Sequence, residues 1–180
     1  MDATEKTQQI IEFCKKITYR QRVIFSDESN LKLPSHVIDE DQESYAKKKP
    51  NGLWYSVGPA WISYLTNGYK DHGKTWEKKR LTLISNIYQI RLKKSLIYCI
   101  NTEKEFDDFV LKYATKDESK VRWNKVAEDG WNGIEIRYLE SRDYGWYEGW
   151  DCSSGCLWHP KVVKKIDTLA SWDYSWERSR

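Results

Sequence analysis

The chain has 180 residues, which is enough for one domain with a buried core that needs neither disulfides nor a structural metal. Its longest apolar runs are much shorter than a membrane span, and residues 1–9 contain no apolar segment of the kind found in secretion signals. We therefore predict a single cytoplasmic domain over residues 1–180, with reduced cysteines and no membrane partner. Nothing in the sequence indicates an oligomeric state.

Aromatic side chains are the main compositional feature, with ten Trp and twelve Tyr against four Phe. Trp and Tyr combine a flat apolar ring with a polar group, so they suit ligand-pocket walls and base-stacking surfaces as well as a small core. The formal net charge of +3 neither requires nor excludes a nucleic-acid partner, because such binding depends on local clusters. Basic clusters at residues 47–49, 78–80 and 161–165 are predicted to be solvated surface.

Four elements are predicted in the first part of the chain. Apolar residues spaced by three or four indicate a helix over residues 4–17, and a strand follows at residues 22–26. The polar stretch 27–50 predicts a long surface loop. Turn residues then lead into an aromatic strand over residues 53–56, and Pro59 is placed to begin the next helix.

The second part of the chain continues the mixture of helices and strands. The predicted elements are strands over 86–92 and 96–100, helices beginning at Thr102 and over 123–127, a strand over 134–138, and a basic helix over 161–169. Thr102 and Glu105 form a capping box, which marks the start of a helix. Val162, Val163 and Ile166 are spaced as the inner face of the last helix. This order predicts an α+β domain, followed by a tail over residues 171–180 that contains two Trp.

Two short motifs resemble known chemical sites but lack their context. Residues 68–75 satisfy the phosphate-loop pattern G-x-x-x-x-G-K-T, yet a predicted helix precedes them where a buried strand is needed. Bulky residues also stand where that loop must curl, so we expect Lys74 to be ordinary surface. Cys152, Cys156 and His159 offer three zinc ligands close in sequence without a fourth. We therefore predict no metal site.

Two blocks carry a resemblance to known proteins. Residues 49–56 fit K-P-x-G-L-W-x-S, and residues 146–158 fit W-Y-x-x-W-D-C-x-S-G-C-x-W, as in a set of small, poorly characterised proteins. The order of features over residues 20–168 resembles the ADP-ribosyltransferase fold. These features are a first strand with polar residues at its end, an aromatic-Ser strand leading into a helix, a late Gly-Trp-x-Gly-Ile strand, and an acidic residue before a strand near Pro160. The resemblance implies small split β-sheets that form a central cleft flanked by helices.

The same resemblance implies the residues of a site. The implied catalytic residues are Asp151, as the carboxylate, and Ser56. The residues implied to bind NAD are Arg22, Ser26, Trp54, Tyr55, Ser56, Trp150 and Ser154. Two positions depart from the usual pattern: Ser26 stands where many members have His or Arg, and the usual glutamate position falls near Ser153 or Ser154.

The activity that the resemblance implies is NAD-dependent transfer of ADP-ribose to a macromolecule, either protein or nucleic acid. The alternative is a non-catalytic module that uses an aromatic groove for a nucleotide, RNA or protein partner. Both alternatives depend on the strand at residues 53–56, whose side chains alternate between two faces. We expect Trp54 and Ser56 on the ligand side, with Leu53 and Tyr55 on the opposite side. Tyr55 then reaches the ligand only if the strand ends or bulges there, which Gly58 and Pro59 just downstream favour.

Overall fold

The structure is a computed structural model that describes residues 2–28, 31–34, 49–67, 80–137 and 144–172. Its strands are β1 (Arg22–Ser26), β2 (Leu53–Val57), β3 (Asn86–Leu92), β4 (Tyr98–Ile100), β5 (Gly133–Ile136), β6 (Ser154–Leu157) and β7 (Val163–Ser171). Its helices are α1 (Ala3–Cys14), α2 (Ala60–Asn67), α4 (Glu103–Tyr113) and α5 (Trp123–Glu128), with 3-10 turns η2 (Lys94–Leu96) and η3 (Pro160–Val162). The predicted α+β class is confirmed. The phosphate-loop pattern at 68–75 lies outside the described residues.

Capping side chains begin two of the helices. The Asp2 carboxylate accepts hydrogen bonds from the backbone amides of Thr4 and Glu5, at 2.7 and 2.8 Å, and so caps α1. At the start of α4, the Thr102 hydroxyl accepts from the Glu105 amide at 3.2 Å, while the Glu105 carboxylate accepts from the Thr102 amide at 3.0 Å. The predicted capping box is therefore confirmed. No helix in the described ranges is both long enough and apolar enough to cross a bilayer.

All seven strands join one sheet, in the order β4-β5-β6-β2-β1-β3-β7. Only β4 and β5 run parallel; every other neighbouring pair is antiparallel. The prediction of separate small sheets is wrong, because β1 and β2 remain paired at Arg22–Val57 and Val23–Ser56. That pairing covers two positions, whereas β1 pairs with β3 over five. The two strands separate beyond Val23, so the sheet is nearly divided at its centre.

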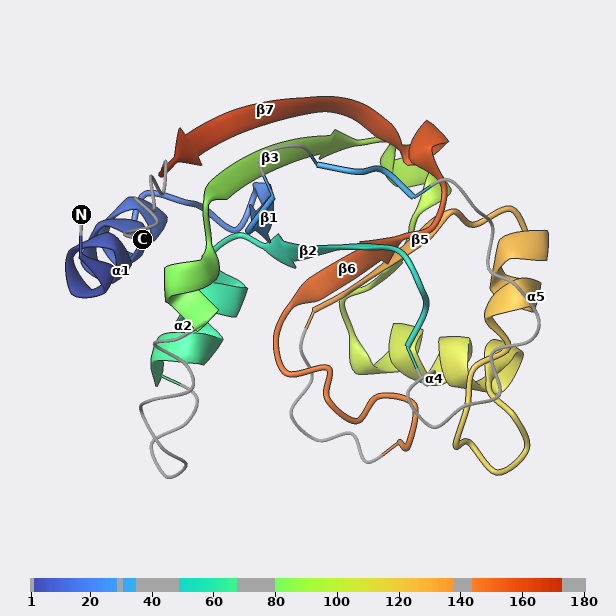
Figure 1. Cartoon of the computed structure of the whole chain (residues 1–180). Coiled ribbons are helices and arrows are strands. Elements are labelled where there is room, and N and C mark those ends of the chain that lie inside the picture. The colour runs from blue at the N-terminus through green and yellow to red at the C-terminus, as the bar shows by residue number, and fades with distance from the viewer. Residues whose placement is uncertain (1, 29–30, 35–48, 68–79, 138–143, 173–180) are drawn as a thin grey trace, which may run out of the picture.

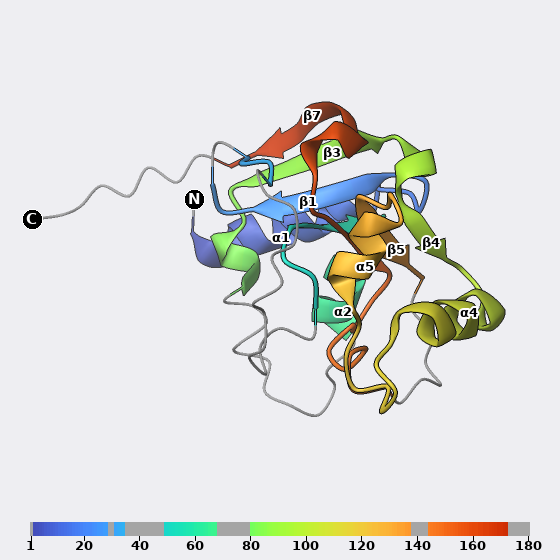
Figure 2. The same ribbon diagram turned by 90° about the vertical axis from the view of Figure 1, so that its right-hand side faces the viewer.

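The sheet curves so that β3 and β7 arch over β2 and β6 (Figure 1). Its concave face encloses one hydrophobic core, which includes Tyr55 from β2, Ile90 from β3 and Leu157 from β6. The outer face carries two further cores, one beneath α1 and α2 and one beneath α4 and α5. These helix pairs lie at opposite ends of the molecule in Figure 1, and Figure 2 shows α2, α4 and α5 below β1, β3 and β7.

Most of the tryptophans in the described residues serve the core beneath α4 and α5. Trp146 is fully buried and stacks on Phe106, with ring centroids 5.2 Å apart and planes 14° from parallel. Trp158 is also buried and donates its indole N–H to the Trp131 carbonyl at 3.0 Å. In the C-terminal tail, Trp172 packs on the edge of Phe13 against α1. The high Trp content thus reflects packing first, and a ligand surface only at particular positions.

The helix predicted over residues 161–169 is wrong, because these residues form η3 and most of β7. The register of β7 on β3 shifts between Arg91 and Leu92, which places a bulge at Lys164. Owing to that extra residue, Val163 and Ile166 both pack into the concave core although they are three positions apart. The bulge therefore gives the inward-facing residues of this strand the three-residue spacing that is typical of one face of a helix.

A buried polar network crosses the concave face beneath the centre of the sheet. Glu135 on β5 accepts a hydrogen bond from the Arg22 Nε at 2.8 Å and a second, from the Arg22 Nη2, on its other oxygen. The Tyr55 hydroxyl donates to the same carboxylate at 2.9 Å. The Tyr55 ring crosses β6 at Gly155, where an added Cβ would lie 2.3 Å from the ring. Burial and the Glu135 charge raise the pKa of Tyr55 well above its ordinary value, so the hydroxyl remains a donor.

The network predicts a large difference between two glutamate substitutions. Glu135→Gln should lower the free energy of unfolding by about 3–5 kcal/mol, because it leaves the buried Arg22 cation without its counter-charge. Glu128→Gln, on the exposed end of α5, should change it by less than about 0.5 kcal/mol. Urea denaturation of both variants measures the difference. Equal stability of the two variants would contradict a structural role for the network.

Candidate functional site

A cavity of ≈ 350 Å³ opens on the outer face of the sheet, where β1 and β2 separate. It lies between the two outer cores. Its first wall belongs to or packs against the core beneath α1 and α2, and consists of Val23, Phe25, Trp61 and Tyr64. Its second wall belongs to the core beneath α4 and α5, and consists of Trp54 and Trp150. The cavity thus follows from the short β1–β2 pairing and from the separation of the helix pairs.

The alternation of β2 decides which of its side chains reach the cavity. Trp54 and Ser56 line it, whereas Leu53 and Tyr55 pack into the concave core on the other face. The predicted division of this strand into two faces is confirmed. Tyr55 also contributes to the cavity wall, although its hydroxyl is bonded to Glu135 on the concave side.

Aromatic pairs fix the shape of both walls. Trp54 meets Trp150 edge to face, with centroids 4.9 Å apart and an angle of 63°. Across the cavity, Phe25 and Trp61 lie 5.1 Å apart at 32°. Such pairs add about 0.5–1.5 kcal/mol beyond the burial of area, so the walls are held in defined positions. A flat apolar ring is the kind of ligand group that fits between them.

Three charged side chains line the same cavity: Lys49, Arg80 and Asp151. The Lys49 ammonium donates to the Gly149 carbonyl and lies 5.6 Å from the centroid of the Trp54 ring. Gly149 has a φ of +74°, a conformation that favours glycine, in the turn just before Asp151. Burial lowers the pKa of Lys49, and the nearby Asp151 charge acts in the opposite direction. The cavity therefore offers both signs of charge, with the Asp151 side chain exposed.

Neither Cys152 nor Ser154, which also line the cavity, is activated as a nucleophile. Burial, reinforced by the Asp151 charge, raises the pKa of Cys152 to about 11, so its thiol is protonated at neutral pH. The Ser154 hydroxyl donates to the Cys152 carbonyl at 3.0 Å. Across the part of the chain that the structure describes, no three His, Cys, Asp or Glu side chains gather into a metal-binding group.

The Ser56 hydroxyl is used by the fold. It donates to the Gly58 carbonyl at 2.9 Å and accepts from the Trp61 backbone amide at 3.0 Å, while the residue is 4 % exposed. Ser56 therefore ties the end of β2 to the first turn of α2. Because the hydroxyl proton is already donated to Gly58, Ser56 shapes the cavity by holding the turn between β2 and α2.

The structure brings together most of the residues implied by the resemblance and leaves two outside. The cavity is lined by Trp54, Tyr55, Ser56, Trp150, Asp151 and Ser154. Arg22 instead lies on the concave face in the ion pair with Glu135. Ser26 is at the far end of β1, where its hydroxyl accepts from the Glu28 amide at 3.0 Å.

Sequence reasoning missed Lys49, Arg80 and Trp61 as cavity residues. Lys49 begins the block over residues 49–56 that also contains Trp54, and this closeness in sequence could have indicated that both residues line the same site. Trp61 follows the β2 turn closely, but its position in a predicted helix suggested only core packing. Arg80 is distant in sequence from the other residues, so no local pattern pointed to it.

Comparison of the chain with protein-family models, with curated proteins and with solved structures found no match. The site is therefore interpreted from its own residues.

The turn around Ser56 predicts a stability difference within one segment. Ser56→Ala should lower the free energy of unfolding by about 1–2 kcal/mol, because the Trp61 amide at the start of α2 loses its acceptor. Ser63→Ala, inside α2, should be neutral or slightly stabilising, since Ala has the higher helix propensity. Thermal and urea unfolding measure both. A Ser56→Ala protein as stable as Ser63→Ala would show that the hydroxyl does not support the turn.

Proposed function

We propose that the protein is an NAD-dependent ADP-ribosyltransferase that modifies a macromolecule, either protein or nucleic acid. The observation that carries the proposal is the cavity between β1 and β2, which combines facing aromatic walls with Lys49, Arg80 and Asp151. NAD presents complementary chemistry: two flat rings, a diphosphate and a ribose that becomes cationic as its bond to nicotinamide breaks. The resemblance of residues 20–168 to the ADP-ribosyltransferase fold supports the same conclusion.

The cavity residues divide the tasks of binding. Trp54 and Trp61, on opposite walls, are suited to pack against the nicotinamide ring. Lys49 and Arg80 supply positive charge for the diphosphate, where charge-assisted hydrogen bonds are the strong ones. A volume of ≈ 350 Å³ lies within the size range of small-molecule sites, so it accommodates part of a dinucleotide while the remainder lies along the opening.

Transfer breaks the bond between C1′ of the ribose and the nicotinamide nitrogen, and nicotinamide leaves with the bonding electron pair. Among the described residues that line the cavity, Asp151 carries the carboxylate that can stabilise the oxocarbenium-like state. The acceptor then forms a bond to C1′ and releases its proton, and the Asp151 carboxylate is the candidate base for that proton.

One observation favours a second candidate function, a non-catalytic module that binds a nucleotide, RNA or protein partner in the same aromatic groove. The Ser56 hydroxyl is occupied by its bonds to Gly58 and Trp61, so one of the two implied catalytic groups serves the fold. A module of this kind keeps the aromatic walls and needs no carboxylate. The two functions differ in a single measurable step, the release of nicotinamide.

Asp151→Asn should reduce transfer by about 100- to 1000-fold while leaving the fold intact, because the substitution removes the charge that stabilises the transition state. The measurement is the release of nicotinamide and the labelling of macromolecules when the purified protein is incubated with labelled NAD and cell lysate. Nuclease and protease treatment of the labelled product identifies the class of acceptor.

Glu148→Gln is the matched control, because Glu148 is an exposed carboxylate in the turn just before Asp151 and does not line the cavity. It should retain the wild-type rate. Equal rates in wild type and Asp151→Asn would refute the role of Asp151. Binding of NAD without any release of nicotinamide by the wild type would favour the non-catalytic module.

A further inference from the structure

A strongly basic surface lies at the end of the sheet where β1 begins, β3 ends and β7 begins. The strand registers bring these three segments together, because Arg22 is opposite Ile90 and Arg91 is opposite Lys165. The Lys93 amide also donates to the Val162 carbonyl at 2.8 Å, which joins the end of β3 to η3. Residues 20–22, 91–94 and 161–167 therefore form one continuous surface.

The exposed cations of this basic surface are Arg20, Arg91, Lys93, Lys94, Lys161, Lys164 and Lys165. The same three segments contain one carboxylate, Asp167, which pairs with Arg91 at 3.7 Å and with Lys165 at 2.5 Å. Seven positive charges and one negative charge give this surface a net charge of +6, which exceeds the formal net charge of +3 for the whole chain. The excess is thus concentrated here, and acidic residues elsewhere compensate for it.

A hollow of ≈ 160 Å³ lies within the basic surface. Arg20, Arg91 and Lys94 line it together with the amide side chains of Gln21 and Gln89. The buried Arg22–Glu135 pair also lines this hollow, and its two charges offset each other. Ile90, Leu92, Ile97 and Cys99 also line the hollow. The guanidinium, ammonium and amide groups supply the hydrogen-bond donors that a single phosphate group needs.

We propose that this basic surface binds the phosphodiester backbone of a nucleic acid, with one phosphate in the hollow and its neighbours along the lysines of β3, η3 and β7. Tyr19, which is 61 % exposed beside Arg20, offers an aromatic ring on which a base can stack. Cations on three adjacent segments match the repeated charges of a nucleic-acid strand. A membrane surface fits less well, because among the described residues of these segments and their neighbours Tyr19 is the one large exposed apolar side chain.

This binding is separate from the cavity between β1 and β2. Arg22 and Val23 are adjacent on β1 and point to opposite faces, and Arg22 lines the basic hollow while Val23 lines the cavity. The proposal therefore does not rest on NAD chemistry. It stands if nucleic acid binds and NAD is never consumed, and it fails if NAD is consumed and nucleic acid does not bind.

The experiment compares two triple variants by fluorescence anisotropy with short labelled single-stranded RNA, single-stranded DNA and duplex DNA over a range of salt. The test variant combines Arg20→Ala, Lys93→Ala and Lys94→Ala. The control removes three exposed lysines on α4 and the segment that follows it, by Lys104→Ala, Lys116→Ala and Lys120→Ala. Figure 1 shows α4 at the bottom of the molecule and β3 and β7 at the top, so the control leaves the basic surface unchanged.

We expect the test variant to bind at least about tenfold more weakly than wild type, with the slope of log affinity against log salt reduced by about 2 for a single strand. The control variant should bind as wild type does, and both should unfold at the wild-type temperature. Comparison of the three probes shows which form of nucleic acid binds best. Absence of binding by wild type, equal losses in both variants, or stronger binding to phosphatidylserine vesicles than to every nucleic-acid probe would overturn the proposal.

Discussion

The buried contact of Glu135 with Arg22 and Tyr55 is the constraint on which the rest of the structure depends. It joins β1, β2 and β5 across a sheet whose two halves share only two paired positions between β1 and β2. A charged pair in this position loses its hydration, and that loss is offset only if the geometry and the additional hydrogen bonds are good. Tyr55 provides one of those bonds, and Gly155 provides the room for its ring. Packing beneath the sheet thus explains Gly155 in the block over residues 146–158.

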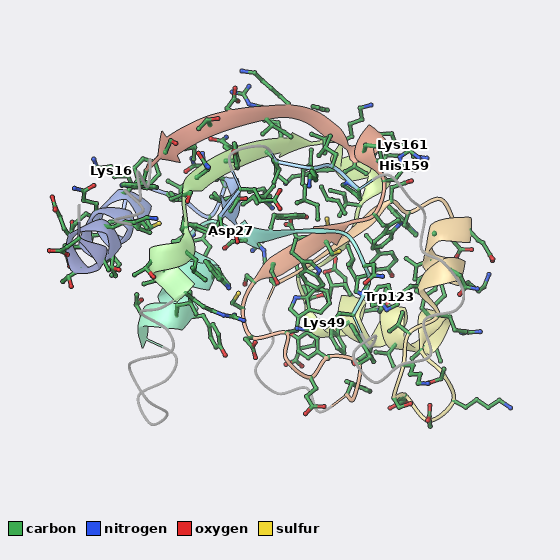
Figure 3. All side chains as sticks on the ribbon, viewed as in Figure 1. Lys16, Asp27, Lys49, Trp123, His159 and Lys161 are labelled. Carbon is green, nitrogen blue, oxygen red and sulfur yellow. The ribbon has the colours of Figure 1, made fainter. Side chains whose placement is uncertain are left out.

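The cavity follows from the same arrangement. Because the network ties Arg22 and Tyr55 to Glu135 beneath the sheet, β1 and β2 can separate beyond Val23 without losing the fold. Each half of the sheet then carries its own helices and core, and the aromatic residues at the edges of those cores face each other across the gap. The turn held by Ser56 places Trp61 on one wall of the cavity. The contact between Lys49, labelled in Figure 3, and Gly149 positions the segment that carries Asp151 near the other wall. The site is therefore built from the margins of two packed cores.

Local patterns in the sequence predicted much of this fold and part of the site. The alternation of Leu53–Ser56 and the capping box at Thr102 depend on neighbouring residues alone, so both could be predicted. The strand β7 could not, because the bulge at Lys164 spaces its inner residues as in a helix. Arg22 was expected at the ligand and instead pairs with Glu135, which is 113 positions away in the chain. Arg80 was missed for the same reason, because only the folded chain brings it to the cavity that Asp151 also lines. Side-chain partners distant in sequence are decided by the topology of the sheet.

Calorimetric titration of NAD measures whether the cavity between β1 and β2 binds NAD between its aromatic walls, as we propose. We expect one site per chain with a Kd below about 1 mM, weakened at least about tenfold in Trp54→Leu. We expect no change in Trp172→Leu, which alters a tryptophan packed against α1 and away from the cavity. Absence of binding heat with the wild-type protein, or equal affinity in Trp54→Leu and wild type, would show that NAD does not bind between these walls.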